Sequence, residues 1–224
     1  MTKVILALHG TGLGARLTAP AFRTALAAAG VGAVQVNLDD ADVAPAIMRF
    51  GPAEPITALV SVWTDGDPAA VVRTVADSAD ESTPHAYLVR ERVRLDPVPV
   101  PDGVRCDAMV NIALLRRPGS MTREEYLRYW LIQHTPIAIR TQNTVAYIQN
   151  VVEEVLTPSA PEIAAIVEEH FPMGAMTDPH LFYGSRGDES ELDRRVTELM
   201  ASVARFGAGT GLDLVPTSRY HWNI

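Results

Sequence analysis

The residue with the clearest potential for chemistry is His134, in the stretch YWLIQHTPIA, residues 129–138. An imidazole has an ordinary pKa of about 6.5, so it can take up and return a proton near neutral pH. His134 is therefore our candidate general base or acid. The alternative interpretation is a core histidine held by a carbonyl or a carboxylate, because a buried imidazole without partners is costly.

Aromatic residues accompany this histidine on a predicted helix that begins at Thr122, where Glu125 completes a capping box. Spacings of three and four residues put one stripe of side chains on the same helix face: Tyr126, Trp130, Gln133, His134 and Ile137. We expect this stripe to face a sheet, with Pro136 perturbing the last helical turn near one mouth of a barrel. The histidine would then lie between packed aromatic rings and an accessible cavity.

Further side chains could hold a substrate beside the histidine. Tyr147 is a second catalytic candidate, since its phenol could bind a carbonyl or enolate oxygen; ordinary core packing is the alternative. Tyr129 and Trp130 would supply aromatic walls, and Asn111, which interrupts the apolar run VNIALL, could donate to a ligand oxygen or mark a bulge or sheet edge. Asn150 is another candidate for substrate contact. It has the opposite parity to Tyr147, so only one of the two can face a given cavity.

Several other chemistries find no support in the sequence. Lys3 is the only lysine, which argues against a Schiff-base enzyme, and Cys106 is the only cysteine, which excludes an intrachain disulfide. His170 and His180, with acidic residues nearby, fit no compact metal-ligand motif. There is no GxSxG nucleophile elbow, and GTGLG at 10–14 is not a phosphate-binding loop. We predict neither a metal nor a bound cofactor.

The charge balance also narrows the partners. The chain of 224 residues carries a net charge of −8 and has a pI near 5.2. Nucleic acids and anionic membranes both require clustered Lys and Arg, which this sequence lacks. It has no apolar run long enough for a membrane span, and its first apolar run is too short for a signal peptide. We expect a cytoplasmic protein whose partner is a small hydrophobic molecule; a homodimer is left open.

The elements that must position these residues follow one pattern twice. In the first half we predict strands at 3–10, 31–38, 55–63 and 84–95 and helices at 18–30 and 67–79. In the second half we predict strands at 107–115, 145–155, 180–184 and 212–222, with helices from 122 and over 188–207. The segment 161–170 is predicted to be a short helix, within a connection (157–179) that could be a lid or a surface excursion.

Both halves therefore have the order βαββαβ. We predict an α+β fold of two tandem ferredoxin-like halves, whose bare sheet faces are buried against each other in a barrel or a sandwich. The expected boundaries are an N-terminal half at 1–95, a proline-rich linker at 96–104 and a C-terminal half at 105–224.

The second half resembles the EthD domain family over residues 107–183. The similarity lies in RPGSMTREEYLRYWLIQHTPIA at 117–138 and TVAYIQN at 144–150. Members of this family and of the dimeric α/β-barrel superfamily have ferredoxin-like halves whose sheets enclose a ligand cavity. The resemblance therefore implies an α/β barrel of the dimeric α/β-barrel type. The superfamily includes cofactor-free monooxygenases, isomerases, polyketide cyclases, dehydratases and haem enzymes. The first half has no counterpart of the Trp-to-His segment, so at most one such site per chain is implied.

These observations lead to two main functional hypotheses. The first is a cofactor-independent lyase, dehydratase, cyclase or isomerase that acts by proton transfer on a small hydrophobic carbonyl or aromatic, polyketide-like compound. The second is a non-catalytic EthD-like protein that binds a small molecule or responds to stress. A third, oxidative hypothesis, with haem or with dioxygen acting on an activated phenol, is kept beside them.

Overall fold

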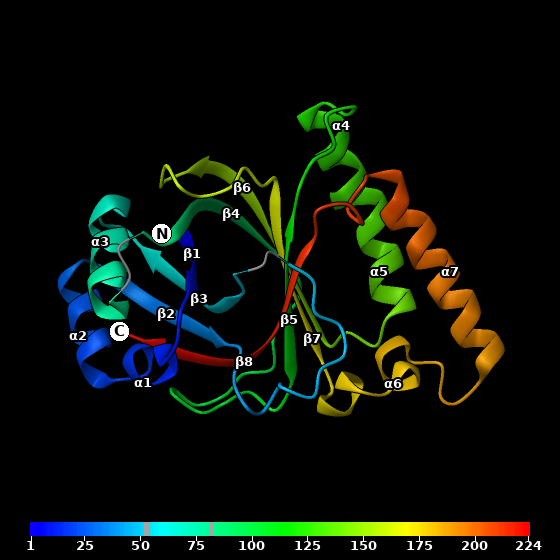
Figure 1. Cartoon of the computed structure of the whole chain (residues 1–224), viewed down its shortest axis with the longest axis horizontal. Helices are drawn as coiled ribbons and strands as arrows, with labels where there is room; N and C mark the ends of the chain where they lie inside the picture. The colour runs from blue at the N-terminus through cyan, green and yellow to red at the C-terminus, as the bar shows by residue number, and fades with distance from the viewer. Residues whose placement is uncertain (52–53, 81–82) are drawn as a thin grey trace.

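The computed structural model describes residues 1–51, 54–80 and 83–224. Within them, the strands close into an antiparallel barrel in the order β1-β3-β2-β8-β5-β7-β6-β4 (Figure 1). The strands are β1 (Thr2–His9), β2 (Val31–Leu38), β3 (Ile56–Thr64), β4 (His85–Leu95), β5 (Met109–Leu115), β6 (Ala146–Val155), β7 (Ala165–Phe171) and β8 (Asp213–Asn223).

Each half of the chain contributes one four-stranded sheet with the same internal order, β4-β1-β3-β2 in the first half and β8-β5-β7-β6 in the second. The two sheets join edge to edge, because β2 pairs with β8 and β4 pairs with β6. A closed barrel leaves no unpaired strand edge. The predicted α+β fold of two tandem ferredoxin-like halves is confirmed.

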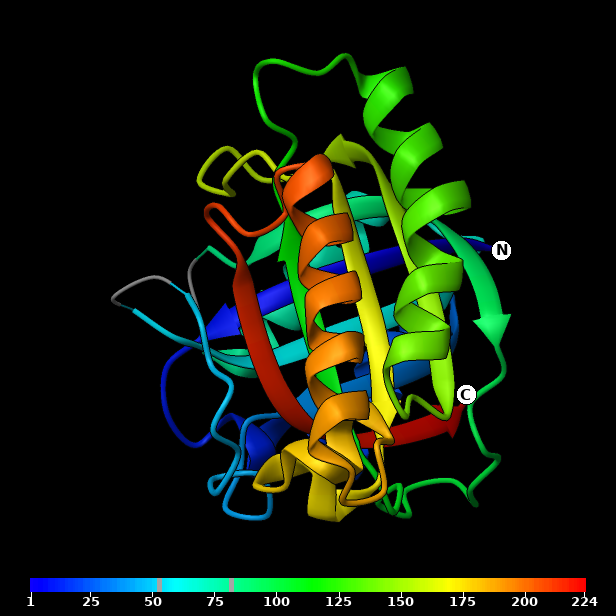
Figure 2. The ribbon, with the colours of Figure 1, turned by 90° about the vertical axis from the view of Figure 1, so that its right-hand side faces the viewer.

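Helices cover the outside of both sheets, as Figures 1 and 2 show. The first sheet is covered by α1 (Leu13–Leu17), α2 (Pro20–Ala28) and α3 (Pro68–Ala79). The second is covered by α4 (Arg123–Arg128), the π-helix η1 (Tyr129–His134), α5 (Thr135–Thr141) and α7 (Glu189–Arg205). The short 3-10 helix η2 (Met173–Met176) and α6 (Pro179–Tyr183) lie in the β7–α7 connection. No helix among the described residues is long and apolar enough to cross a membrane.

Strand alternation divides the apolar side chains into separate layers. One layer fills the barrel and comes from both halves, with Ile5, Tyr87, Ile112 and Ile166 among its members. Two others lie between each sheet and its own helices, and a smaller fourth cluster includes residues of η2 and α6. Both faces of the second-half strands are therefore buried, which is why their sequences look apolar throughout.

The predicted helix from Thr122 is confirmed at its start, where Thr122 and Glu125 form the capping box. Its end differs from expectation. Pro136 lies in the first turn of α5, and the helical path continues to Thr141. The wider π-turn of η1 comes directly before Pro136, which has no N–H to give to the preceding turn. This turn also changes the predicted stripe, since His134 is buried while Gln133 is exposed.

Two assignments between 161 and 184 were wrong. Residues 165–170, predicted as part of a helix, lie in β7 (Ala165–Phe171), and residues 180–184, predicted as a strand, lie in and just after α6. The strand was hidden because its inward positions include Glu168 and His170, so its alternation does not separate apolar from polar residues. Asp178 caps α6 and Pro179 follows at its first position, a standard helix start.

Candidate functional site

A cavity of about 470 Å³ lies between the outer face of the second sheet and its helices. It is outside the barrel, so the sheet-enclosed cavity implied by the family resemblance is not the one found. Its lining is mostly apolar and includes no lysine or arginine among the described residues: Met48, Phe50, Asn111, Ala113, Leu115, Trp130, His134, Gln142, Tyr147, Val167, Glu169, Phe182, Tyr183, Leu199, Met200, Val203, Phe206, Ala208, Gly209, Gly211, Leu212 and Leu214.

Three polar side chains form a row across the floor of this cavity. Glu169 on β7 is opposite Asn111 on β5 in the strand register and opposite Tyr147 on β6. Directly opposed residues in an antiparallel sheet have Cβ atoms about 5 Å apart, so the three side chains are immediate neighbours. The sheet register thus brings an amide, a carboxyl and a phenol to one place.

The helical side of the cavity carries Trp130 and His134 from η1. His134 Nδ1 lies 3.0 Å from Ser202 Oγ of α7, and its ring packs on Phe206 at a centroid distance of 4.6 Å. Burial lowers the pKa of His134 to about 4, because it disfavours the charged imidazolium. His134 therefore meets a ligand as a neutral imidazole at pH 7. The interaction with Ser202 leaves Nε2 for that ligand.

Glu169, like Tyr183, is an ionisable residue of the site that the sequence analysis missed as a candidate. It was considered only as a nearby acid in the discarded metal hypothesis. It is half-buried, and burial raises its pKa to about 7. With its amide nitrogen turned toward Glu169, Gln142 donates to Oε1 at 3.1 Å. The alternation of β7 could have pointed to this residue had the strand been recognised.

Asn111 Oδ1, an acceptor, is buried on the cavity wall and has no hydrogen-bond partner among the described residues. Buried polar groups normally find partners, so an unpaired acceptor beside a cavity indicates that the ligand supplies a donor, such as a hydroxyl. The indole N–H of Trp130 interacts instead with the phenol of Tyr147.

The predicted site residues lie in three places: on the cavity wall, behind it, and inside the barrel. His134, Tyr147, Trp130 and Asn111 all line the cavity. Tyr129 lies behind it, stacked on Phe206 at 5.7 Å.

Asn150 lies on the opposite face of β6, inside the barrel, where its Nδ2 donates to Glu168 Oε1 at 3.0 Å. The substrate contact predicted for Asn150 does not apply to this cavity, because strand parity turns it away. No three His, Cys, Asp or Glu side chains of the described chain gather as a metal site would need.

One wall of the cavity comes from the first half of the chain. The segment after β2 crosses to the second sheet, where Phe50 pairs with Leu214 through two backbone hydrogen bonds. Met48 and Phe50 thereby reach the cavity. The C-terminal half does not build this site alone.

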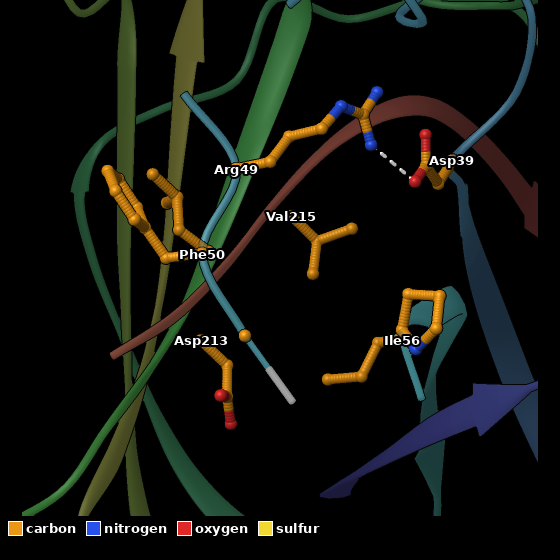
Figure 3. Close-up of a pocket in the computed structure, with 9 residues that line it drawn as sticks. Asp39, Arg49, Phe50, Ile56, Asp213 and Val215 are labelled. Carbon is orange, nitrogen blue, oxygen red and sulfur yellow. Dashed lines mark hydrogen bonds and ion pairs between the residues drawn. The ribbon is translucent and has the colours of Figure 1, made fainter. Parts of the chain in front are cut away.

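Phe50 also borders a smaller cavity of about 170 Å³, shown in Figure 3. The most prominent charged group there, Arg49, is bound to Asp39 and donates to Val43 O at 2.9 Å. This cavity contains neither His134 nor Glu169. The larger cavity is therefore the candidate active site.

The fold is the predicted α/β barrel of two ferredoxin-like halves. No protein-family model matches the chain, and no curated protein matches it by sequence. Among solved structures, it is similar to an anthrone oxidase-like protein, with a TM-score of 0.58 at 9% identity over 99% of this chain and 92% of the other.

The chain is also similar to two candidate monooxygenases. The one from Fusobacterium nucleatum gives a TM-score of 0.50 at 7% identity, over 99% of this chain and 93% of the other. The one from Lactobacillus acidophilus gives 0.46 at 8% identity, over 97% and 92%. At these identities the similarity concerns the fold.

Proposed function

We propose that the protein is a cofactor-independent acid–base enzyme acting on a small hydrophobic carbonyl or aromatic, polyketide-like compound. The observation that carries this proposal is the cavity itself, in which apolar walls surround one group of polar side chains. Two of them, His134 and Glu169, can exchange a proton with a ligand. The resemblance to the EthD family over residues 107–183 agrees with this function.

The chemistry that suits these groups is removal of a proton from a carbon next to a carbonyl. The C–H electron pair then moves onto the carbonyl oxygen and gives an enolate, which needs hydrogen-bond donors. Tyr147 can supply one such donor from the cavity floor. Burial, followed by the nearby Glu169, raises the pKa of Tyr147 well above its usual value, so its phenol keeps the proton and can donate.

The proton could then be returned elsewhere on the substrate, as in an isomerase, or a hydroxide could leave, as in a dehydratase. The name of the anthrone oxidase-like neighbour favours a second candidate, in which dioxygen reacts with the deprotonated substrate. Both candidates begin with the same proton transfer. Uptake of dioxygen separates them, and binding without conversion would leave the non-catalytic alternative.

The test is a screen of the wild type and His134→Ala against hydrophobic ketones and phenols, including anthrone. Thermal shift measures binding, mass spectrometry measures products and an oxygen electrode measures dioxygen uptake. We expect multiple turnovers by the wild type and retained binding but heavy loss of rate in the variant. His134→Asn keeps a hydrogen-bonding group toward Ser202 and so controls for a loss of activity caused by misfolding. His221→Ala, on β8, is a matched control in which a different histidine is removed. Equal binding by all variants without any product would refute an enzymatic function.

A further inference from the structure

We propose that Glu169 is the catalytic base of this site and that His134 acts as a neutral hydrogen-bonding group toward the substrate oxygen. The inference rests on the proposed function, which leaves both residues available for proton exchange. It assigns a role to a residue in the row Asn111–Glu169–Tyr147, which the sheet register places on the cavity floor.

The first argument is a comparison of two adjacent glutamates on β7. Glu168 points into the barrel, where Lys3 Nζ lies 2.9 Å from its Oε1 and Gln35 Nε2 donates to its Oε2 at 2.7 Å. Glu169 points outward and has no ion pair within the described chain. One carboxylate is fixed by a cation, while the other faces the cavity without one. Only Glu169 can give or take a proton without breaking an ion pair.

The second argument concerns everything that faces Glu169. The ionisable groups around the cavity are Tyr147 from β6, Tyr183 from α6 and His134 from η1, and none is a cation at neutral pH. The residues that α7 and β8 contribute are apolar: Leu199, Met200, Val203 and Leu214. An ionised carboxylate in this setting is stabilised mainly by the Gln142 amide. A ligand that displaced water would destabilise the carboxylate further and make it a stronger base.

The third argument is the match between each group and its task. A general base works best when its pKa is near the working pH, and that of Glu169 is about 7. His134, with a pKa of about 4, is a weak base but a good uncharged hydrogen-bond donor, provided that Nε2 carries the proton. Ser202 Oγ can donate to Nδ1 and so favour that tautomer.

The proposed step transfers a proton from a carbon next to a carbonyl to the Glu169 carboxylate. The C–H bond breaks, the O–H bond of a neutral Glu169 forms, and the electron pair passes to the carbonyl oxygen. That oxygen accepts hydrogen bonds from His134 and Tyr147, which both line the cavity. No oxidant takes part in this step.

Two measurements test the assignment. Difference infrared spectroscopy between about pH 5 and about pH 9 should show a carboxyl C=O band that titrates near pH 7. The band should be absent in Glu169→Gln and present in the matched control Glu162→Gln, which changes an exposed glutamate.

The second measurement uses anthrone, whose binding is checked first by thermal shift. Anaerobic exchange of its methylene protons in D₂O is followed by mass spectrometry. We expect Glu169→Gln to bind anthrone but exchange it about 10²–10⁴-fold more slowly. In His134→Asn we expect a slower rate with the same pH midpoint, since the base is unchanged.

The outcomes separate the two proposals. Exchange by Glu169→Gln at the wild-type rate, or the absence of a band that titrates near pH 7, would overturn the role of Glu169 and leave the enzymatic proposal standing. A wild type that binds anthrone, shows the band and exchanges no proton would overturn acid–base catalysis on this ketone, and the catalytic role of Glu169 with it.

Discussion

The replacement Glu169→Gln should make the protein more resistant to a rise in pH. In the wild type, burial raises the pKa of Glu169 from its ordinary 4.5 to about 7. The folded state therefore binds this proton more tightly than the unfolded state does. The associated stability is fully present below pH 4.5 and is lost as the pH rises through 7. Glutamine does not titrate, so the variant escapes this loss.

The magnitude follows from the two pKa values. Each pKa unit corresponds to about 1.4 kcal/mol. Because the unfolded state releases this proton at a lower pH than the folded state does, the free energy of unfolding falls by roughly 1 kcal/mol at pH 5 and by roughly 3 kcal/mol at pH 8. Between these two values the wild type should therefore lose roughly 2–3 kcal/mol more than Glu169→Gln. Other titrating groups act alike in both proteins and cancel in the difference.

Urea unfolding at pH 5 and pH 8 measures this difference, and Glu168→Gln gives the opposing case. Lys3 and other partners hold the pKa of Glu168 at about 2 despite its burial, so its stabilisation is present above pH 4.5 and lost as the pH falls toward 2. Glu168→Gln should therefore be destabilised at both pH values. A pH dependence of Glu169→Gln equal to that of the wild type would refute the reasoning, because the carboxyl would then be ordinarily hydrated.

Three further replacements test other parts of the structure. Phe50→Ala should weaken binding of an apolar ligand about tenfold by calorimetry with little change in unfolding, because Phe50 is 53% exposed; a large loss of stability would contradict this. Ser202→Ala should lower the free energy of unfolding by about 1 kcal/mol and change the ring-nitrogen NMR shifts of His134. Unchanged shifts would mean that the contact is absent in solution. Lys3→Met should cost about 3–5 kcal/mol in urea unfolding, since it leaves Glu168 buried without its cation; a loss below about 1 kcal/mol would show that Glu168 is neutral.

Much of the fold was predictable because its signals are local. The capping box at Thr122 and Glu125 involves residues three apart, and Asp67 begins α3 in the same local way. Strands such as β5 are recognisable as apolar runs. Two consecutive βαββαβ units then restrict the possible architectures to a few.

The position of the site was harder to predict because its causes are distant in sequence. Tyr147 and Asn150 lie on opposite faces of β6 because side chains alternate along a strand. Both faces are buried, so the residue types do not show which face lines the cavity and which faces the barrel interior. The π-turn of η1 changes the helical phase before Pro136, and periodicity at 3.6 residues per turn does not anticipate it. Met48 and Phe50 enter from the other half of the chain through a backbone pairing with Leu214.

Closure of the barrel brings residues of the two halves into contact, and the two glutamates of β7 show how such a contact affects the candidate active site. Consecutive residues of a strand face opposite sides, so inserting Glu168 into the barrel obliges Glu169 to face the helices. Burying Glu168 is tolerable because Lys3, 165 residues away in sequence, enters the same interior from β1. The ion pair between the halves thus stabilises the arrangement of β7 in which Glu169 faces the cavity. Lys3→Met should consequently impair proton transfer as well as folding, although Lys3 lies on the far side of the sheet from the site.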